Sequence, residues 1–382
     1  MIQFRNSLWL LCALALFLPA AAAAEETAGD SPDTPASGVQ AMIQTLGLRE
    51  SGRATREFPG WKRPRLVVAF VDGPQRLAGL QAAAPGAEIL LVSSDAEAAD
   101  RIAGADVLLG SCNEEILSRA DRLKWVQVYS AGVDHCVGNP GMRQGDKLLT
   151  NGQRIASPAL AEHAIALTLA LARGLDRYMT NQASGVWARD IGLGQEDIFE
   201  LQGRTMLVVG LGGIGTQVAS RAHGLGMRVI ATRHSRREGP DYVDYVGLAG
   251  EASKLAREAD VVVNAAPLTD ETRGMFNAAF FEAMKPSAFF VSVGRGASTV
   301  TDDLVAALRE GRLAGAGLDV TDPEPLPPGH PLWTMPRVII TPHVAGRSDR
   351  SRDRLFLLVR ENLRRYTAGE PLLSEVDIER GY

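Results

Sequence analysis

The chain has 382 residues, which exceeds one ordinary hydrophobic core and fits two domains of roughly 100–200 residues each. Hydrophobic residues make up 46% of it and charged residues 22%, a balance typical of a soluble globular protein and not of a disordered chain. A net charge of −5 argues against a general binder of nucleic acid or of membrane surfaces, so we interpret any basic cluster as a local site.

The first 24 residues have the order of a secretory signal peptide. A short polar start with Arg5 leads into an apolar stretch, residues 8–18, and then into a run of alanines that ends at Ala24. We expect cleavage after Ala24, and a periplasmic or secreted protein. The alternative is an uncleaved membrane anchor that leaves the protein facing the cytoplasm, although the apolar stretch is short for a membrane span. No membrane contact is expected beyond this segment.

Residues 25–63 are rich in acidic residues, proline, serine, threonine and glycine, and we expect a flexible leader there. Beyond the signal peptide two cysteines remain, Cys112 and Cys136, and each follows a predicted strand. A disulfide between them is conceivable in an oxidising compartment. Two cysteines do not make a disulfide framework, however, so free thiols are the favoured prediction.

From residue 65 onward, short apolar runs alternate with segments long enough for helices. The runs at 65–71, 88–93, 106–109 and 123–128 predict buried strands of a parallel sheet. The pattern changes at Ser157 and Pro158, which are typical of a helix start. The helix that follows is apolar on nearly every side, so it must be buried between domains or against a second subunit, and we take it as the hinge region.

A second alternating series begins after this helix. Strands are predicted at 206–209, 227–232, 260–265, 288–293, 316–320 and 337–341. The fold class is therefore α/β, with two doubly wound parallel sheets of the Rossmann or flavodoxin-like kind. Residues 346–366 form an amphipathic pattern, a helix that can cross back to the first domain.

The stretch from Gly210 to Gly215 reads G-x-G-x-x-G and lies between a predicted strand and a predicted helix. Glycine permits the tight turn at Gly210, the backbone approach to a pyrophosphate at Gly212, and the close packing of helix and strand at Gly215. The N–H groups at the start of the helix then bind the anion. The sequence predicts a dinucleotide site, and a plain glycine-rich turn is the alternative.

The next strand ends at Thr232, where an NAD enzyme carries an acidic residue for the ribose 2′-hydroxyl. This chain has Arg233, His234, Ser235 and Arg236 instead. Guanidinium groups bind a 2′-phosphate, whereas a carboxylate repels it. We therefore predict NADP(H) over NAD(H), against the alternative of a solvated basic loop.

Three polar residues lie at or beyond the ends of later strands: Arg295, Glu324 and His343. Ligands of open α/β sheets bind at the carboxyl ends of strands, so these residues are expected to meet. An arginine can bind a carboxylate, and a histidine supported by an acid can donate a proton to a developing alkoxide. Separately, each has an ordinary explanation as a surface ion pair, a loop acid or a satisfied polar group; together they predict an active site.

Six motifs support a resemblance: YSAGVDH (129–135), GLGGIG (210–215), NAAPLTDETRGMFN (264–277), SVGRG (292–296), GLDVTDPEP (317–325) and ITPHVAG (340–346). In this order they resemble the D-isomer-specific 2-hydroxyacid dehydrogenases, which include the glyoxylate/hydroxypyruvate reductases. The resemblance implies reduction of a small 2-keto acid, glyoxylate or hydroxypyruvate, to the D-2-hydroxy acid. Arg295, Glu324 and His343 would be catalytic, with the proton from His343, and Ala131, Gly132 and Arg295 would bind the substrate.

The resemblance also implies a substrate domain of residues 64–153 plus 346–382, an NAD(P)-binding Rossmann domain of residues 154–345, and a reactive cleft between them. Two cofactor domains would pair into a homodimer. No metal and no nucleic acid are expected. The predicted cofactor-binding residues are Gly210, Gly212, Gly213, Ile214, Gly215, Arg233, His234, Ser235, Arg236, Ala266, Pro267, Thr269, Val293, Gly294, Asp319, His343 and Gly346.

Two features depart from the family. Ser292 stands where the family often has asparagine, and we expect only a local backbone adjustment there. Export is the larger departure, because NADPH is not normally supplied outside the cytoplasm. The alternative function is a non-catalytic NAD(P)-sensing protein of the same fold, and a Rossmann enzyme acting on amino acids is a further possibility. The sensor predicts no turnover of any keto acid, and the amino-acid enzyme predicts a dependence on ammonia.

Overall fold

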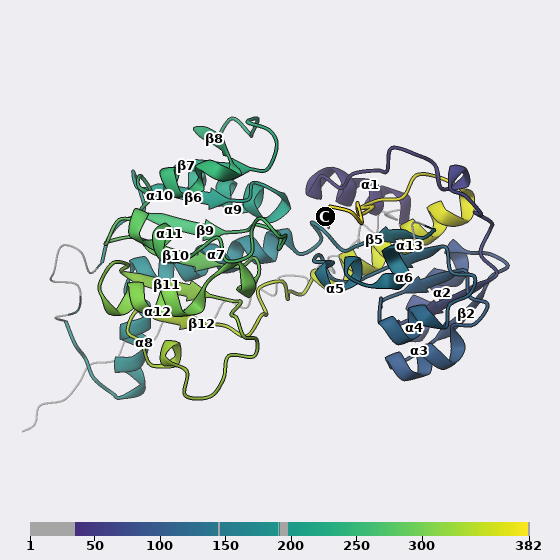
Figure 1. The fold of residues 1–382 in the computed structure, drawn as a ribbon, viewed down its shortest axis with the longest axis horizontal. Helices are drawn as coiled ribbons and strands as arrows, with labels where there is room; N and C mark the ends of the chain where they lie inside the picture. Colours follow the sequence, from purple (N-terminus) through teal and green to yellow (C-terminus); the bar gives the residue numbers. More distant parts are fainter. Residues whose placement is uncertain (1–34, 144–145, 190, 192–197, 381–382) are drawn as a thin grey trace, which may run out of the picture.

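A computed structural model describes residues 35–143, 146–189, 191 and 198–380. It shows two lobes, each built on a parallel sheet, so the predicted fold class is confirmed (Figure 1). The predicted signal peptide, residues 1–24, lies outside the described residues. Within them, no helix has both the length and the apolar character that a membrane span requires.

The first sheet has five parallel strands in the order β2-β1-β3-β4-β5. Helices cover both of its faces, because alternate side chains of a strand point to opposite sides. Val67 and Ala69 of β1 pack with residues of α2 and α13, and Val68 packs with residues of α3 and α4. The strands are β1 (Leu66–Ala69), β2 (Glu88–Leu91), β3 (Val107–Leu109), β4 (Trp125–Gln127) and β5 (Leu148–Thr150), and the helices are α1 (Pro35–Leu46), α2 (Pro74–Ala83), α3 (Asp95–Arg101), α4 (Glu114–Ser118), α5 (Asp134–Val137), α6 (Pro140–Arg143) and α13 (Ser351–Ala368).

The second sheet has seven parallel strands in the order β12-β11-β10-β9-β6-β7-β8. Chain order reverses between β6 and β9, which is the topological switch point where such sheets bind ligands. The strands are β6 (Thr205–Val209), β7 (Arg228–Arg233), β8 (Tyr245–Leu248), β9 (Val261–Asn264), β10 (Phe289–Ser292), β11 (Gly315–Leu318) and β12 (Val338–Ile340), and the helices are α7 (Ser157–Ala172), α8 (Leu175–Ala183), α9 (Gly213–Gly224), α10 (Ala252–Ala256), α11 (Ala278–Ala283) and α12 (Thr301–Arg309).

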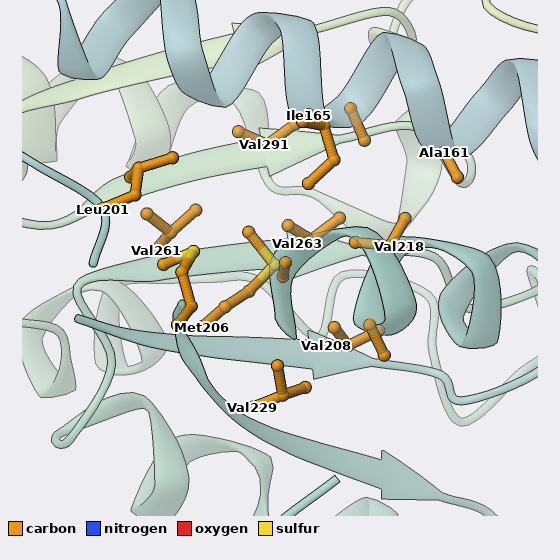
Figure 2. Close-up of a cluster of buried hydrophobic side chains, with 14 of the residues drawn as sticks. Ala161, Ile165, Leu201, Met206, Val208, Val218, Val229, Val261, Val263 and Val291 are labelled. Carbon is orange, nitrogen blue, oxygen red and sulfur yellow. The ribbon is translucent and has the colours of Figure 1, made fainter. Parts of the chain in front are cut away.

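The apolar helix after Ser157 is α7, and its own lobe buries one side of it. It packs against α9 and against strands β10 and β11. In Figure 2, Ile165 of α7 and Val218 of α9 lie over the strand residues Val208 and Val263 in one apolar cluster. Elsewhere on the helix, Ala166 is exposed and Leu160 and Leu169 are only partly buried. The place of α7 between the sheet and a second helix therefore explains part of its apolar composition.

The C-terminal helix returns to the first lobe, as expected. α13 packs against α2 and α1 there, and Leu363 and Tyr366 are buried against the first sheet. Trp125 of β4 stacks on Tyr366, with ring centroids 5.1 Å apart. The second lobe is thus enclosed in sequence between two parts of the first.

The prediction of a flexible leader over residues 25–63 is wrong from Pro35 onward. α1 occupies Pro35–Leu46, and its buried residues Val39, Met42 and Leu46 recur at helical spacing and pack against α13. The chain then continues along the C-terminal segment, where Glu50 pairs with Leu373 in an antiparallel bridge. The polar composition hid a short amphipathic helix with one apolar stripe.

The prediction of free thiols is also wrong, because Cys112 and Cys136 form a disulfide. Cys112 follows β3 and Cys136 lies in α5, and both side chains are buried. The bond ties the end of β3 to the short helix that directly follows residues 130–133. The prediction considered only a framework of several disulfides, whereas a single bond between Cys112 and Cys136 is enough to fix α5 beside the end of β3.

Candidate active site

Arg295, Glu324 and His343 follow three neighbouring strands, β10, β11 and β12. All three strands are parallel, so their carboxyl ends lie along one edge of the sheet. A Cβ on Gly296, the residue after Arg295, would overlap the backbone of Thr321 in the segment that carries Glu324. The structure therefore brings the predicted catalytic segments together.

His343 and Glu324 form a hydrogen-bonded pair. Nδ1 of the histidine lies 2.6 Å from Oε1 of the glutamate. Both side chains are about half exposed, so the pair lies at the surface of the lobe and not in its core. Because Nδ1 faces the carboxylate, Nε2 is the ring nitrogen left to face a substrate.

Asp319 holds the loop that carries His343. Its buried carboxylate accepts hydrogen bonds from the backbone N–H groups of Val344 and Ala345, each at 3.0 Å, and from the hydroxyl of Thr341 at 2.6 Å. His163 of α7 reaches the same hydroxyl at 2.8 Å. We predicted Asp319 as a cofactor contact, and the structure places its carboxylate on the backbone of this loop. The part played by His163 was not predicted.

Arg295 meets the predicted substrate loop of the other lobe. Its Nε lies 3.4 Å from Oδ1 of Asp134, and a Cβ on Gly132 would overlap its guanidinium group. The carbonyl oxygens of Ala131 and Gly132 already accept hydrogen bonds from Asn151 and Ser130, at 2.7 Å each. No hydrogen bond runs from their N–H groups to any residue in the described part of the chain, so these donors remain for a carboxylate.

A buried polar network supports the backbone at Arg295. The amide of Asn264, at the end of β9, donates to the hydroxyls of Ser292 at 3.0 Å and of Ser298 at 2.8 Å. Ser298 in turn donates to the carbonyl oxygen of Arg295 at 2.6 Å. Ser292 is therefore a member of this network. The sequence analysis did not single out Asn264, although a polar residue at the end of a buried strand is the signal that could have found it.

The glycine turn has the geometry that its motif predicts. Gly210 has φ of 93°, a conformation that favours glycine, and a Cβ there would come within 2.8 Å of the backbone of Ala266. A Cβ on Gly215 would overlap the carbonyl oxygen of Gly210, so only glycine allows this approach of helix and turn. α9 begins at Gly213, with its first N–H groups directly after the turn.

A cavity of about 1360 Å³ lies against this turn. Residues of both lobes line it, among them Arg49 and Arg154 from outside the second sheet. Nε of Arg233 is buried and has no hydrogen-bond partner among the described residues. The size, the helix start and this unpaired donor fit the phosphates of a dinucleotide. Of the predicted cofactor residues, those in the lining are Gly210, Gly212, Gly213, Arg233, His234, Ser235, Arg236, Ala266, Pro267 and Thr269, and those outside it are Ile214, Gly215, Val293, Gly294, Asp319, His343 and Gly346.

Comparisons with known proteins place these features in a family context. A family model described as D-isomer specific 2-hydroxyacid dehydrogenase, NAD binding domain, matches residues 165–345. The glyoxylate reductase/hydroxypyruvate reductase of Mus musculus is 31% identical over 330 residues, covering 83% of this chain and 100% of that protein. The glyoxylate reductase of Pyrococcus furiosus is 35% identical, covering 68% of this chain and 77% of that protein.

Solved structures agree with these matches. A D-isomer specific 2-hydroxyacid dehydrogenase family protein from Aeromonas salmonicida superposes with a TM-score of 0.72 at 33% identity, covering 82% of this chain and 99% of that one. An NADPH-dependent glyoxylate/hydroxypyruvate reductase from Sinorhizobium meliloti, in complex with NADP and sulfate, gives 0.71 at 30% identity, covering 83% and 99%.

Proposed function

We propose a specific reaction for this chain, which belongs to the D-isomer specific 2-hydroxyacid dehydrogenase family and is an NAD(P)-dependent oxidoreductase of CH–OH groups. The reaction is reduction of a small 2-keto acid to the D-2-hydroxy acid, with NADPH as the preferred reductant. The observation that carries the proposal is the pair of His343 and Glu324, which lies on the same sheet edge as an arginine in contact with the opposite lobe.

The residues of the site divide the work of binding and proton transfer. The guanidinium group of Arg295 and the N–H groups of Ala131 and Gly132 bind the substrate carboxylate. NADPH bound at the glycine turn would supply the hydride for the keto carbon. Nε2 of His343 donates a proton to the keto oxygen as the carbonyl electron pair moves onto that oxygen. Glu324 faces Nδ1 at 2.6 Å and orients the ring for this transfer.

Glyoxylate and hydroxypyruvate are the substrates that we favour. The relatives from Mus musculus and Pyrococcus furiosus carry the names of reductases of these acids, and both are at least 30% identical to this chain. The site offers one cation and two N–H donors for a single carboxylate. That arrangement suits a short 2-keto acid better than a dicarboxylic one.

NADPH should give a higher kcat/KM than NADH in an assay with either acid. Arg233 ends β7 and Arg236 follows it, at the place where an NAD-dependent enzyme carries an acid, and both offer guanidinium groups to the 2′-phosphate. Steady-state kinetics with both cofactors, on protein that lacks residues 1–24, measure the ratio. Arg233→Ala should lower it by roughly ten-fold, since a hydrogen bond to a charged group contributes about 1.5–3 kcal/mol. A wild-type preference for NADH would contradict the cofactor assignment.

We also propose a homodimer. α7 is only partly covered by its own lobe, with Ala166 exposed, and α8 and the residues after it expose Met179 at 67% and Trp187 at 87% of their surface. Exposed apolar side chains gathered in one segment are typical of an interface. Light scattering of the full chain tests this: a mass of one chain at micromolar concentration would contradict it.

Export is likewise proposed. Disulfides persist mainly in oxidising compartments, so the bond between Cys112 and Cys136 supports the signal peptide predicted from the sequence. A tagged full-length chain should fractionate outside the cytoplasm, and neither buried cysteine should react with a maleimide until a reductant is added. Cytoplasmic protein with two reactive thiols would contradict the proposal.

A further inference from the structure

Arginines from both lobes line the cavity at the glycine turn. Arg233 and Arg236 belong to the second lobe, where Arg233 is the last residue of β7 and Arg236 follows that strand. Arg49 comes from the segment after α1, and Arg154 from the crossing segment between β5 and α7. Neither Arg49 nor Arg154 belongs to a recognised cofactor motif, so the role of this pair is open.

The acids in the lining are already satisfied. Glu50 pairs with Arg365 at 2.9 Å, Glu375 with Arg53 at 3.7 Å and Asp377 with Arg380 at 3.4 Å. Glu271 accepts a hydrogen bond of 2.6 Å from Thr269. Five arginines lie in the lining, and Arg380 is the one that pairs with Asp377. By contrast, no ion pair joins any of the other four, at positions 49, 154, 233 and 236, to an acid in the described part of the chain.

Like charges gathered without counter-charges are costly unless a ligand supplies them. Burial lowers the pKa of Arg154, and the neighbouring charges of Arg49, Arg233 and Arg236 lower it further. Burial also lowers the pKa of Arg233, Arg236 and Arg49 add to that effect, and the charge of Glu238 opposes it. Each of these groups is therefore close enough to repel the others, so the cluster is a site for an anion of high charge.

Arg154 lies directly on the start of α9. A Cβ placed on Gly213, the first residue of that helix, would come within 2.7 Å of its Cγ atom. Its guanidinium group donates a hydrogen bond of 3.3 Å to the carbonyl oxygen of Leu46, the last residue of α1. This position is next to the helix N–H groups that receive a pyrophosphate.

Arg49 is held on a firm support. Its carbonyl oxygen accepts a hydrogen bond of 2.9 Å from the N–H of Ser374, and the next residue, Glu50, forms the antiparallel bridge with Leu373. The backbone is thus fixed to the C-terminal segment, and the residue lines the cavity that Arg233 and Arg236 also line.

We propose that Arg49 and Arg154 complete a phosphate site built from both lobes: Arg49 binds the 2′-phosphate together with Arg233 and Arg236, and Arg154 binds the pyrophosphate at the start of α9. The inference rests on the proposed use of NADPH. It adds that the segment ahead of the first sheet contributes to the cofactor site through residues 49–52, so NADP(H) binding draws on parts of the chain that precede the second lobe.

Equilibrium titrations of the full chain with adenosine 2′,5′-bisphosphate, NADP⁺ and NAD⁺ test this without turnover. Arg49→Ala should raise the Kd of the bisphosphate and of NADP⁺ by roughly ten-fold and leave that of NAD⁺ within about two-fold. Arg49→Lys should lose less, since it keeps the charge without the planar fork. Arg154→Ala should raise the Kd of NADP⁺ and NAD⁺ alike by roughly ten-fold, because both contain the pyrophosphate.

Arg63→Ala is the matched control. Arg63 lies on the same segment ahead of the first sheet, is exposed and is not in the cavity lining, and its loss makes the same change in net charge. It should leave every Kd unchanged, and an equal Tm for all variants shows that each is folded. If Arg233→Ala weakens NADP⁺ binding while Arg49→Ala and Arg154→Ala do not, the inference is overturned and the cofactor preference stands. If wild-type protein binds NAD⁺ as tightly as NADP⁺, the cofactor preference itself fails, and the role of Arg49 fails with it.

Discussion

His343→Ala should lower kcat for keto-acid reduction by roughly 10²–10⁴-fold, the usual range for loss of a positioned proton donor. The imidazole is fixed by the 2.6 Å contact of its Nδ1 with Glu324 and by the loop bonded to Asp319. Alanine removes the ring and its contact with Glu324 but leaves the loop bonded to Asp319 in place. Steady-state kinetics give kcat, and a fluorescence titration gives the Kd of NADPH, which should change by no more than about two-fold because the ring lies outside the cavity lining.

Two further variants make this result specific. Glu324→Gln keeps the shape but replaces the charge-assisted hydrogen bond to Nδ1 with a weaker neutral one that orients the ring less firmly, so kcat should fall by roughly 10–100-fold. His223→Ala changes an exposed histidine in α9, beside Tyr242, and should have no effect on kcat. Full turnover in His343→Ala would assign the proton to another group and remove the basis of the proposed mechanism.

Arg295→Ala should lower kcat/KM for hydroxypyruvate by roughly 10²–10³-fold, equivalent to two charge-assisted hydrogen bonds. The guanidinium group lies against Gly132 of the opposite lobe. Arg295 from one lobe and the loop of the other can therefore bind the same substrate carboxylate. Arg295→Lys should recover only part of this loss, since a lysine is a point charge without a planar fork.

The selectivity of the same variant gives an independent measurement. Wild-type enzyme should prefer hydroxypyruvate strongly to hydroxyacetone, which has the ketone but no carboxylate. Arg295→Ala should lose most of that preference, while Arg228→Ala, which breaks an exposed pair with Glu258, should keep it. An unchanged ratio in Arg295→Ala would show that the carboxylate is bound elsewhere.

The sheets and the catalytic set were predictable because buried parallel strands read as continuous apolar runs, and their carboxyl ends share an edge. The three predicted catalytic residues, Arg295, Glu324 and His343, follow the adjacent strands β10, β11 and β12. Their positions relative to the predicted strands were therefore enough to predict that they lie close together. The two strands that the sequence analysis missed, β5 and β8, are short and lie at sheet edges, where the apolar run is too brief to distinguish from a loop.

Other features depend on contacts between segments far apart in sequence. The disulfide joins cysteines 24 positions apart, and nothing in that spacing shows that the end of β3 meets α5. Arg49 and Arg154 reach the cofactor cavity only because the two lobes adjoin. The helix α1 differs: its apolar residues at 39, 42 and 46 carry a readable helical period, which the polar residues around them obscured.

The disulfide between Cys112 and Cys136 lies next to the predicted substrate loop, so the way the protein is produced can change how that loop is held. Protein produced in a reducing cytosol carries two thiols at positions 112 and 136, and protein that has passed through an oxidising compartment carries the bond. In preparations of identical sequence, residues 130–134 would then differ in mobility, and the measured KM for the keto acid would differ between preparations. Counting free thiols before each kinetic series separates that source of variation from the effect of any substitution.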